Sequence, residues 1–117
     1  MHQFKELGIW KKSRVFCTDI YSITASFPNE EKYGLTNQLR RASVSIPSNI
    51  AEGSSRISNK DFSRFLEIAI GSAYEVETQL IIATDLGFID SQKLILLSNQ
   101  LTEIIKMISK FRTTLKI

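Results

Sequence analysis

Several residue types on which common active sites depend are nearly missing from this sequence. Among its 117 residues there is one cysteine, Cys17, and one histidine, His2. A single cysteine excludes an intrachain disulfide and a CxxC metal site, and we expect Cys17 to be a buried apolar thiol. Histidine carries much of the acid–base and metal chemistry of proteins, and His2 lies near the N-terminus, where chains commonly fray. These absences argue against most hydrolase mechanisms.

Glycine, proline and long apolar runs are also scarce. Five glycines and two prolines are too few for a loop-rich or low-complexity protein. No apolar run approaches the ~20 residues that cross a bilayer, and the first residues, MHQFKELGIWKKSR, lack the apolar core of a signal peptide. We therefore expect a soluble cytoplasmic protein without a membrane partner. With 43% hydrophobic residues, the chain is expected to form one domain over residues 1–117.

The carboxylates do not supply a substitute for the missing histidines. Glu75 and Glu77 are two residues apart, so on a helix they point in different directions and do not form a ligand pair. A di-iron bundle would need Glu-x-x-His motifs, and the sequence has none. We predict a non-enzymatic protein with no catalytic residue, no metal site and no cofactor. A metal-dependent nuclease using Glu75 or Glu77 is the enzymatic alternative.

What the sequence does contain is helical periodicity in four segments. Ser58 is an N-cap candidate for the third segment, with Asp61 at the third helical position of a capping-box-like pattern. Asp90 or Ser91 is a suitable N-cap for the fourth. Because no alternating strand pattern is present, we predict an all-α fold, an antiparallel up-down-up-down four-helix bundle. The predicted helices cover residues 7–26, 35–54, 58–87 and 91–115.

Pro47 lies in the middle of the second predicted helix, in the stretch QLRRASVSIPSNIAEGSSR. A proline inside a helix removes one hydrogen bond and clashes with the carbonyl four residues earlier, here that of Ser43, at a cost of ~3 kcal/mol. A new helix starting at Pro47 would have Ile46 as a poor N-cap. We therefore predict one kinked but continuous helix.

Apolar residues on the second and third helices outnumber a single core stripe. Val44, Pro47 and Ala51 form a second apolar face on the second helix, while Ile68 and Ile82 point away from the main stripe of the third. Isolated exposed apolar residues are normal on protein surfaces. Because these residues line up along the helices, they indicate a self-association surface instead.

The net charge of +3 conceals an uneven distribution of charge. In the predicted bundle, the start of the first helix, the junction of the second and third, and the end of the fourth meet at one end. Eleven basic residues gather there against Glu6 and Asp61, a net charge of +9, while the rest of the chain carries −6. Lysines near a helix C-terminus complement its macrodipole, which explains only the basic residues of the fourth helix.

We predict that this basic end binds the backbone of RNA or DNA; a merely solvated charged end is the alternative. Phe4 and Trp10 are the only aromatic residues expected nearby, so shape and phosphate contacts are favoured over base reading. Arg40 and Arg41 lie away from this end, and we expect both to be structural. The predicted contact residues are Lys11, Lys12, Arg14, Arg56, Lys60, Arg64, Lys106, Lys110, Arg112 and Lys116.

Two long stretches, YGLTNQLRRASVSIPSNIAEGSSR and KDFSRFLEIAIGSAYEVETQL, resemble the four-helix-bundle family of 23S rRNA intervening-sequence-encoded proteins. The resemblance begins at LGIWKKS and extends through Gly87, while the fourth helix matches only in pattern. It implies an up-down bundle that assembles as a ring-like homopentamer. Carried onto this sequence, the ring interface would include Val44, Pro47, Ala51, Ile68 and Ile82. Arg40 lies toward the Val44–Pro47–Ala51 face of the second helix, and we expect it to serve the same contact.

A group similar in fold and ring assembly, the accessory variability proteins of diversity-generating retroelements, binds nucleic acid and a reverse transcriptase through a basic surface. The resemblance therefore implies two functions for this chain. The first is a homo-oligomer that binds RNA or DNA through its basic end. The second is a scaffold ring whose partner is another protein, such as a reverse transcriptase.

Overall fold

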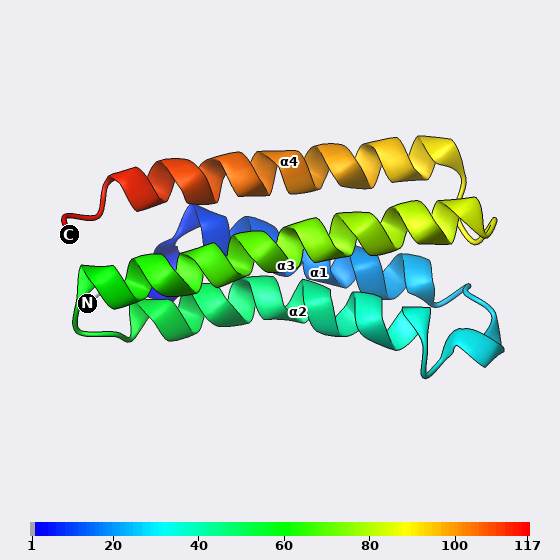
Figure 1. Cartoon of the computed structure of the whole chain (residues 1–117), viewed down its shortest axis with the longest axis horizontal. Coiled ribbons are helices and arrows are strands. Elements are labelled where there is room, and N and C mark those ends of the chain that lie inside the picture. Colours follow the sequence, from blue (N-terminus) through cyan, green and yellow to red (C-terminus); the bar gives the residue numbers. More distant parts are fainter. Residues whose placement is uncertain (1) are drawn as a thin grey trace.

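The computed structural model of the protein describes residues 2–117. Within them the chain forms four long α-helices and two short 3-10 helices, with no strand. The four α-helices lie side by side in a rod of 44 × 24 × 20 Å (Figure 1). The predicted all-α fold of four helices is confirmed. The elements are η1 (Phe4–Glu6), α1 (Gly8–Thr24), η2 (Asn29–Glu31), α2 (Leu35–Ser54), α3 (Asn59–Asp85) and α4 (Ser91–Thr113).

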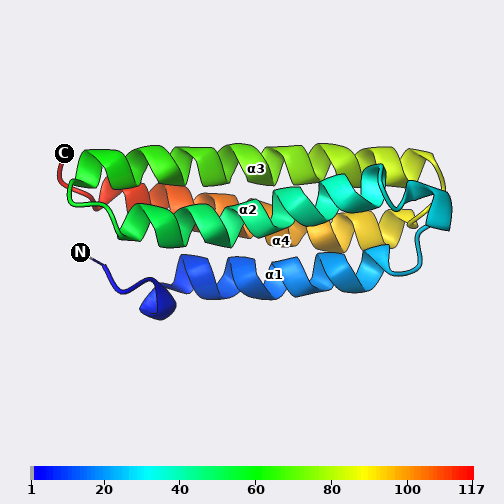
Figure 2. The same cartoon turned by 90° about the horizontal axis from the view of Figure 1, so that it is seen from below.

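Neighbouring helices run in opposite directions along the rod. On α1 and α2, Arg40 Nε donates a hydrogen bond to Thr24 Oγ1 at 2.9 Å, and Cys17 Sγ lies 3.6 Å from Ser43 Oγ. Residue numbers therefore rise along one helix as they fall along the other. The colours of Figure 1 show the same reversal at each connection. Figure 2 views the bundle from the side of α2, with α1 and α3 on its two flanks and α4 behind.

Capping groups begin the third and fourth helices where the sequence predicts them. Ser58 Oγ accepts a hydrogen bond from the backbone N–H of Asp61 at 3.1 Å, and Asp90 Oδ1 accepts one from the N–H of Lys93 at 2.8 Å. Each side chain satisfies an N–H that has no partner within its own helix. Of the two N-caps considered for α4, the structure uses Asp90.

None of the helices described in residues 2–117 is long and apolar enough to cross a membrane.

One apolar core extends along the rod and joins all four helices. The core stripes follow the predicted helical spacing, so each helix buries one face and exposes the other. The largest fully buried side chains include Phe16, Ile20, Leu39, Ile46, Ile50, Phe62, Leu66, Leu80, Leu101, Ile104 and Ile108.

The helices α2 and α3 pack more closely than any other described pair. Small residues permit this approach: Ser45 Oγ lies 2.8 Å from Ser72 Oγ, and Gly53 lies directly against α3. A Cβ atom on Gly53 would stand 2.7 Å from Phe65 Cβ and 2.8 Å from Phe62 Cδ1. The absence of a side chain at Gly53 therefore sets how near the two helices lie at this end.

Pro47 lies inside α2, which continues from Leu35 to Ser54 without a break. The predicted continuity of this helix is confirmed. The proline is buried within the single chain, so the structure removes Pro47 from the surface available to a second subunit. The reason is that its flank of α2 faces α1, as the contacts of Arg40 with Thr24 and of Ser43 with Cys17 show.

Candidate nucleic-acid interface

Three parts of the chain meet at the end of the rod where the charge pattern placed the basic residues. The start of α3 contacts the end of the chain, because Asn59 Nδ2 donates a hydrogen bond to the carbonyl of Lys116 at 3.1 Å. The N-terminal segment joins them through His2, whose ring centroid lies 5.1 Å from that of Phe62 on α3 and 5.7 Å from that of Phe111 on α4. The predicted basic residues of these three parts are therefore brought to one end.

Three of the ten predicted contact residues are paired with acids of the same chain. The sequence-based charge count places these acids outside the basic end, although each lies only three or four residues from a basic residue of that end. Their long side chains nevertheless reach the basic groups, so eleven basic residues face five acids and the net charge of this end is +6 rather than +9. The pairs are Lys12–Glu103, Arg56–Glu52 at 4.0 Å and Arg112–Glu67 at 3.3 Å.

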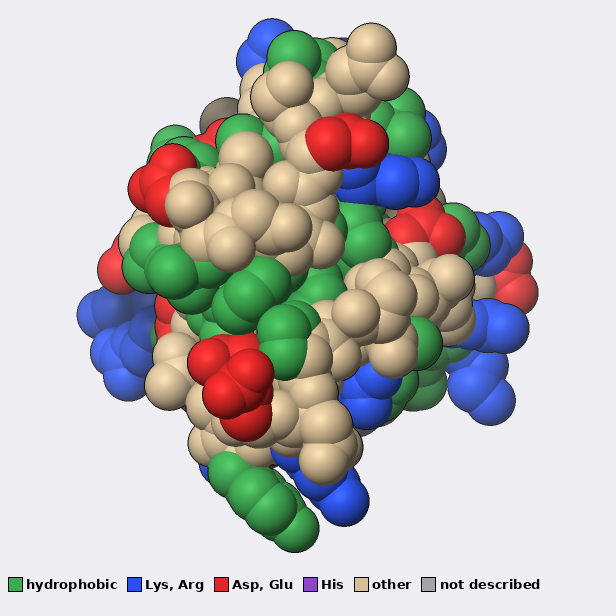
Figure 3. Space-filling view, turned by 90° about the vertical axis from the view of Figure 1, so that its right-hand side faces the viewer, with side chains coloured by type: hydrophobic (Ala, Val, Ile, Leu, Met, Phe, Trp, Pro, Cys, Tyr) green, Lys and Arg blue, Asp and Glu red, His purple; other side chains and the backbone are tan. Residues whose placement is uncertain are grey.

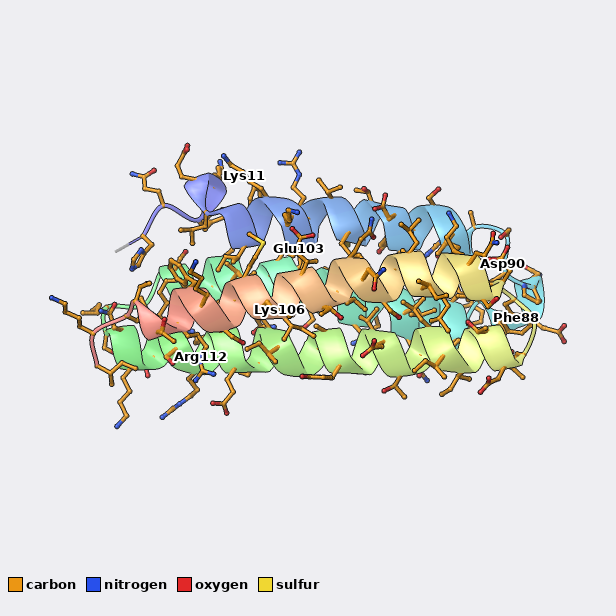
Figure 4. All side chains as sticks on the ribbon, turned by 90° about the horizontal axis from the view of Figure 1, so that it is seen from above. Lys11, Phe88, Asp90, Glu103, Lys106 and Arg112 are labelled. Carbon is orange, nitrogen blue, oxygen red and sulfur yellow. The ribbon has the colours of Figure 1, made fainter. Side chains whose placement is uncertain are left out.

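Two of these pairs join different helices. Lys12 on α1 reaches Glu103 on α4 across a groove of about 310 Å³ that both residues line. Arg112 on α4 pairs with Glu67 on α3, and its Nε also donates a hydrogen bond to Ser63 Oγ at 3.1 Å. Figure 4 shows Glu103 between α1 and α4, and Arg112 at the boundary of α4 and α3. Each of these two basic groups therefore already has an acidic partner on a neighbouring helix.

The other seven predicted contact residues are exposed, and none forms an ion pair within residues 2–117. Lys5, the eleventh basic residue of this end, is also exposed and forms no ion pair among the described residues. Figure 4 shows Lys11 beside η1 and Lys106 on α4, both toward the same end of the rod. The seven are Lys11, Arg14, Lys60, Arg64, Lys106, Lys110 and Lys116.

The opposite end of the rod has a different surface. Figure 3 views this end directly: apolar and uncharged side chains fill its middle, with acidic groups among them. Phe27 and Phe88 close the core there, with their ring centroids 5.4 Å apart. No group of three or more His, Cys, Asp or Glu side chains in the described part of the chain could hold a metal ion.

The predicted oligomer residues that remain exposed form two patches rather than one. Val44, 38% exposed, and the half-buried Ala51 lie on α2, each one helical turn after a residue on its α1 side, Arg40 and Pro47 respectively. Ile68, 48% exposed, and Ile82, 44% exposed, lie on α3 beyond the other flank of α2. Figure 2 shows the two helices that carry these pairs, α2 and α3, side by side.

The guanidinium of Arg40 is held by α1 of its own chain. Besides its hydrogen bond to Thr24, it lies with its Cζ 4.6 Å from the ring centroid of Tyr21. Its Nη2 donates a longer hydrogen bond, 3.4 Å, to the Tyr21 carbonyl. The predicted part of Arg40 in a subunit contact stays a prediction, while Arg41 is exposed on α2.

Residues 5–110 match the family described as 23S rRNA-intervening sequence protein. The chain belongs to this family. The resemblance expected from the motifs of α2 and α3 is confirmed, and the match extends through most of α4, where only the pattern indicated it. No curated protein matches the chain.

One solved structure is similar in fold to this member of the 23S rRNA-intervening sequence protein family. It is the crystal structure of a protein of unknown function from the S23 ribosomal protein family of Bacteroides thetaiotaomicron. The two are similar with a TM-score of 0.83 and 28% sequence identity, over 90% of this chain and 95% of that chain. The four-helix arrangement is thus shared along nearly the full length of both proteins.

Proposed function

We propose that the protein is a non-enzymatic homo-oligomeric bundle that binds the phosphate backbone of RNA or DNA through its basic end. One observation carries the proposal: seven exposed basic side chains lie at that end without an acidic partner within residues 2–117. An unpaired lysine or arginine can neutralise a phosphate and release its condensed counterions, which is the main source of backbone affinity. A basic group already paired with a carboxylate contributes less, because the acid repels the phosphate.

We propose further that the subunits assemble as a ring, with five copies as the family resemblance implies. A closed ring needs a heterologous interface, in which each subunit presents two different surfaces to its two neighbours. The Val44–Ala51 patch on α2 and the Ile68–Ile82 patch on α3 would supply two such surfaces. A ring joined in this way would repeat the basic end in every subunit and multiply its contacts with one polyanion.

The salt dependence of binding tests the nucleic-acid proposal. We expect a structured RNA to bind the full chain at about 50 mM salt and to lose about 10³-fold in affinity by about 200 mM, as for a protein that makes six or more phosphate contacts. Fluorescence anisotropy of a labelled RNA measures this directly. Absence of binding even at the lower salt concentration contradicts the proposal.

Two single substitutions test the ring. Val44→Glu and Ile68→Glu each place a charge in one patch, and we expect each variant alone to be monomeric by native mass spectrometry. An equimolar mixture should form dimers, because one intact patch of each kind then remains to make a single joint. Tyr33→Glu, at an 85% exposed site outside both patches, should leave assembly unchanged. A wild-type chain that is monomeric at micromolar concentration contradicts the ring.

A further inference from the structure

Two aromatic rings and two cations form a contiguous cluster beside the basic end. The ring centroids of Phe4 and Trp10 lie 5.1 Å apart, and their planes meet at 74°. Arg14 Cζ lies 5.3 Å from the Trp10 centroid, and Lys5 Nζ lies 6.0 Å from the Phe4 centroid. We call these four residues the stacking platform.

The short helix η1 brings the platform together. A hydrogen bond of 3.0 Å from the N–H of Leu7 to the carbonyl of Phe4 closes this turn, which folds Phe4 back onto α1. Trp10 and Arg14 are four residues apart, so they share one side of that helix. Both rings are half-buried and both cations are exposed. The platform is therefore anchored to the core and open to solvent on its outer side.

A line of positive charge continues from the platform into the basic end. Lys11 follows Trp10 in the sequence and lies exposed on the outer side of α1, beside η1 (Figure 4). None of Lys5, Lys11 and Arg14 forms an ion pair in residues 2–117. Cations next to partly exposed aromatic rings are a combination by which proteins hold single-stranded nucleic acid: bases stack on rings or guanidinium planes, and lysines follow the phosphates.

We propose that the stacking platform binds unpaired bases of a single-stranded segment, with Lys5 and Lys11 contacting the flanking phosphates. This inference rests on the proposed function and narrows it, because a continuous duplex keeps its base faces stacked inside and offers none to Trp10 or Phe4. Every base has an aromatic face, so the platform selects single strands without reading sequence. The nucleic acid that suits this protein is therefore one with unpaired nucleotides next to a charged backbone.

Fluorescence provides a direct test, because Trp10 is the only tryptophan. A uridine oligonucleotide of roughly 12 nucleotides, within the usual range of single-strand site sizes, is titrated into the full chain at about 50 mM salt. An RNA duplex of the same length is titrated in parallel. We expect the single strand to quench the Trp10 emission and the duplex to leave it nearly unchanged.

Substitutions distinguish stacking from charge. Trp10→Leu should weaken single-strand binding about 10-fold, the loss expected for one stacked base, and leave duplex affinity unchanged. Trp10→Phe retains a ring and should restore most of the affinity, which also excludes misfolding as the cause of the loss. The matched control is Tyr33→Leu: Tyr33 also carries a cation, Lys32 at 5.5 Å, but lies on the connection between α1 and α2, and we expect no effect.

The outcomes separate this inference from the function on which it rests. If the protein binds both RNAs but Trp10→Leu weakens both equally, or weakens neither, the platform does not stack bases and the backbone-binding proposal stands. If Trp10→Phe binds single strands as weakly as Trp10→Leu, the role of Trp10 is structural and the inference fails. If neither RNA binds the wild-type chain at low salt, both proposals fail together.

Discussion

Replacing Lys60 and Lys110 together by glutamate should lower the affinity for RNA by about 100-fold at about 100 mM salt, since two attractions to phosphate become two repulsions. Both lysines are exposed and lack an acidic partner among the described residues. They also come from different helices, α3 and α4. The plot of log affinity against log salt should become shallower by about two units of slope, one for each phosphate that is no longer neutralised. Fluorescence anisotropy at several salt concentrations measures both effects.

The control for this variant changes the net charge by the same amount. Lys32→Glu with Lys93→Glu places the same four-unit change of charge on the connection between α1 and α2 and at the start of α4. We expect less than about a threefold change in affinity, because exposed charges farther away than a Debye length of roughly 10 Å are screened. If the two double variants lose affinity equally, net charge and not the basic end governs binding.

The double substitution Lys60→Glu with Lys110→Glu should change the stability of the fold only a little. Glutamate at position 60 lies in the first turn of α3, where a negative charge stabilises the helix. Glutamate at position 110 lies in the last turn of α4, where a negative charge destabilises the helix. Each effect is about 0.3–1 kcal/mol, so they largely cancel. A loss of binding therefore reports on the interaction with RNA and not on unfolding.

Gly53→Ala should destabilise the fold by about 1–3 kcal/mol, the usual cost of overpacking a well-packed contact. The new methyl group would stand 2.7 Å from Phe65 Cβ, an atom next to the backbone that cannot turn aside. Relief requires α2 and α3 to separate around Gly53. Urea-induced unfolding measures the change, at equal chain concentrations because any self-association would add to the stability.

Gly71→Ala is the matched comparison, since it makes the same chemical change on the same helix pair. A Cβ at Gly71 meets nothing within 4 Å, and the residue lies in the interior of α3. Alanine is a better helix former than glycine by about 0.8–1 kcal/mol, so this variant should be more stable than the wild type. The two substitutions are expected to act in opposite directions. Equal effects would mean that Gly53 does not control the approach of the helices.

The positions of the helices could be predicted closely because their signals are local. The second helix was expected over residues 35–54, and α2 covers Leu35–Ser54. The caps at Ser58 and Asp90 depend on a side chain and an N–H three residues away, a distance within reach of sequence reasoning. The burial of Pro47 depends instead on which flank of α2 the first helix covers, and helical periodicity alone does not choose between flanks.

The candidate site could be predicted only as a region. Helix order indicated which segments share an end, but not that Glu103 would reach Lys12 from another helix or that Glu67 would reach Arg112. Long flexible side chains cross one or two helical turns, which a count by segment cannot follow. The pairing of Phe4 with Trp10 was also hidden, because η1 spans three residues and so short a turn leaves no periodic signal.

The uneven charge of the rod has a consequence for the approach of a ligand as well as for its retention. With +6 at one end and −3 over the remainder, a rod 44 Å long experiences a torque in the field of a polyanion. It turns before contact, so more collisions begin with the basic end leading, and the association rate rises above that of a uniformly charged body. Added salt shortens the range of that field to a fraction of the rod's length. Ionic strength therefore governs how often an encounter begins in a productive orientation, separately from how long the complex lasts.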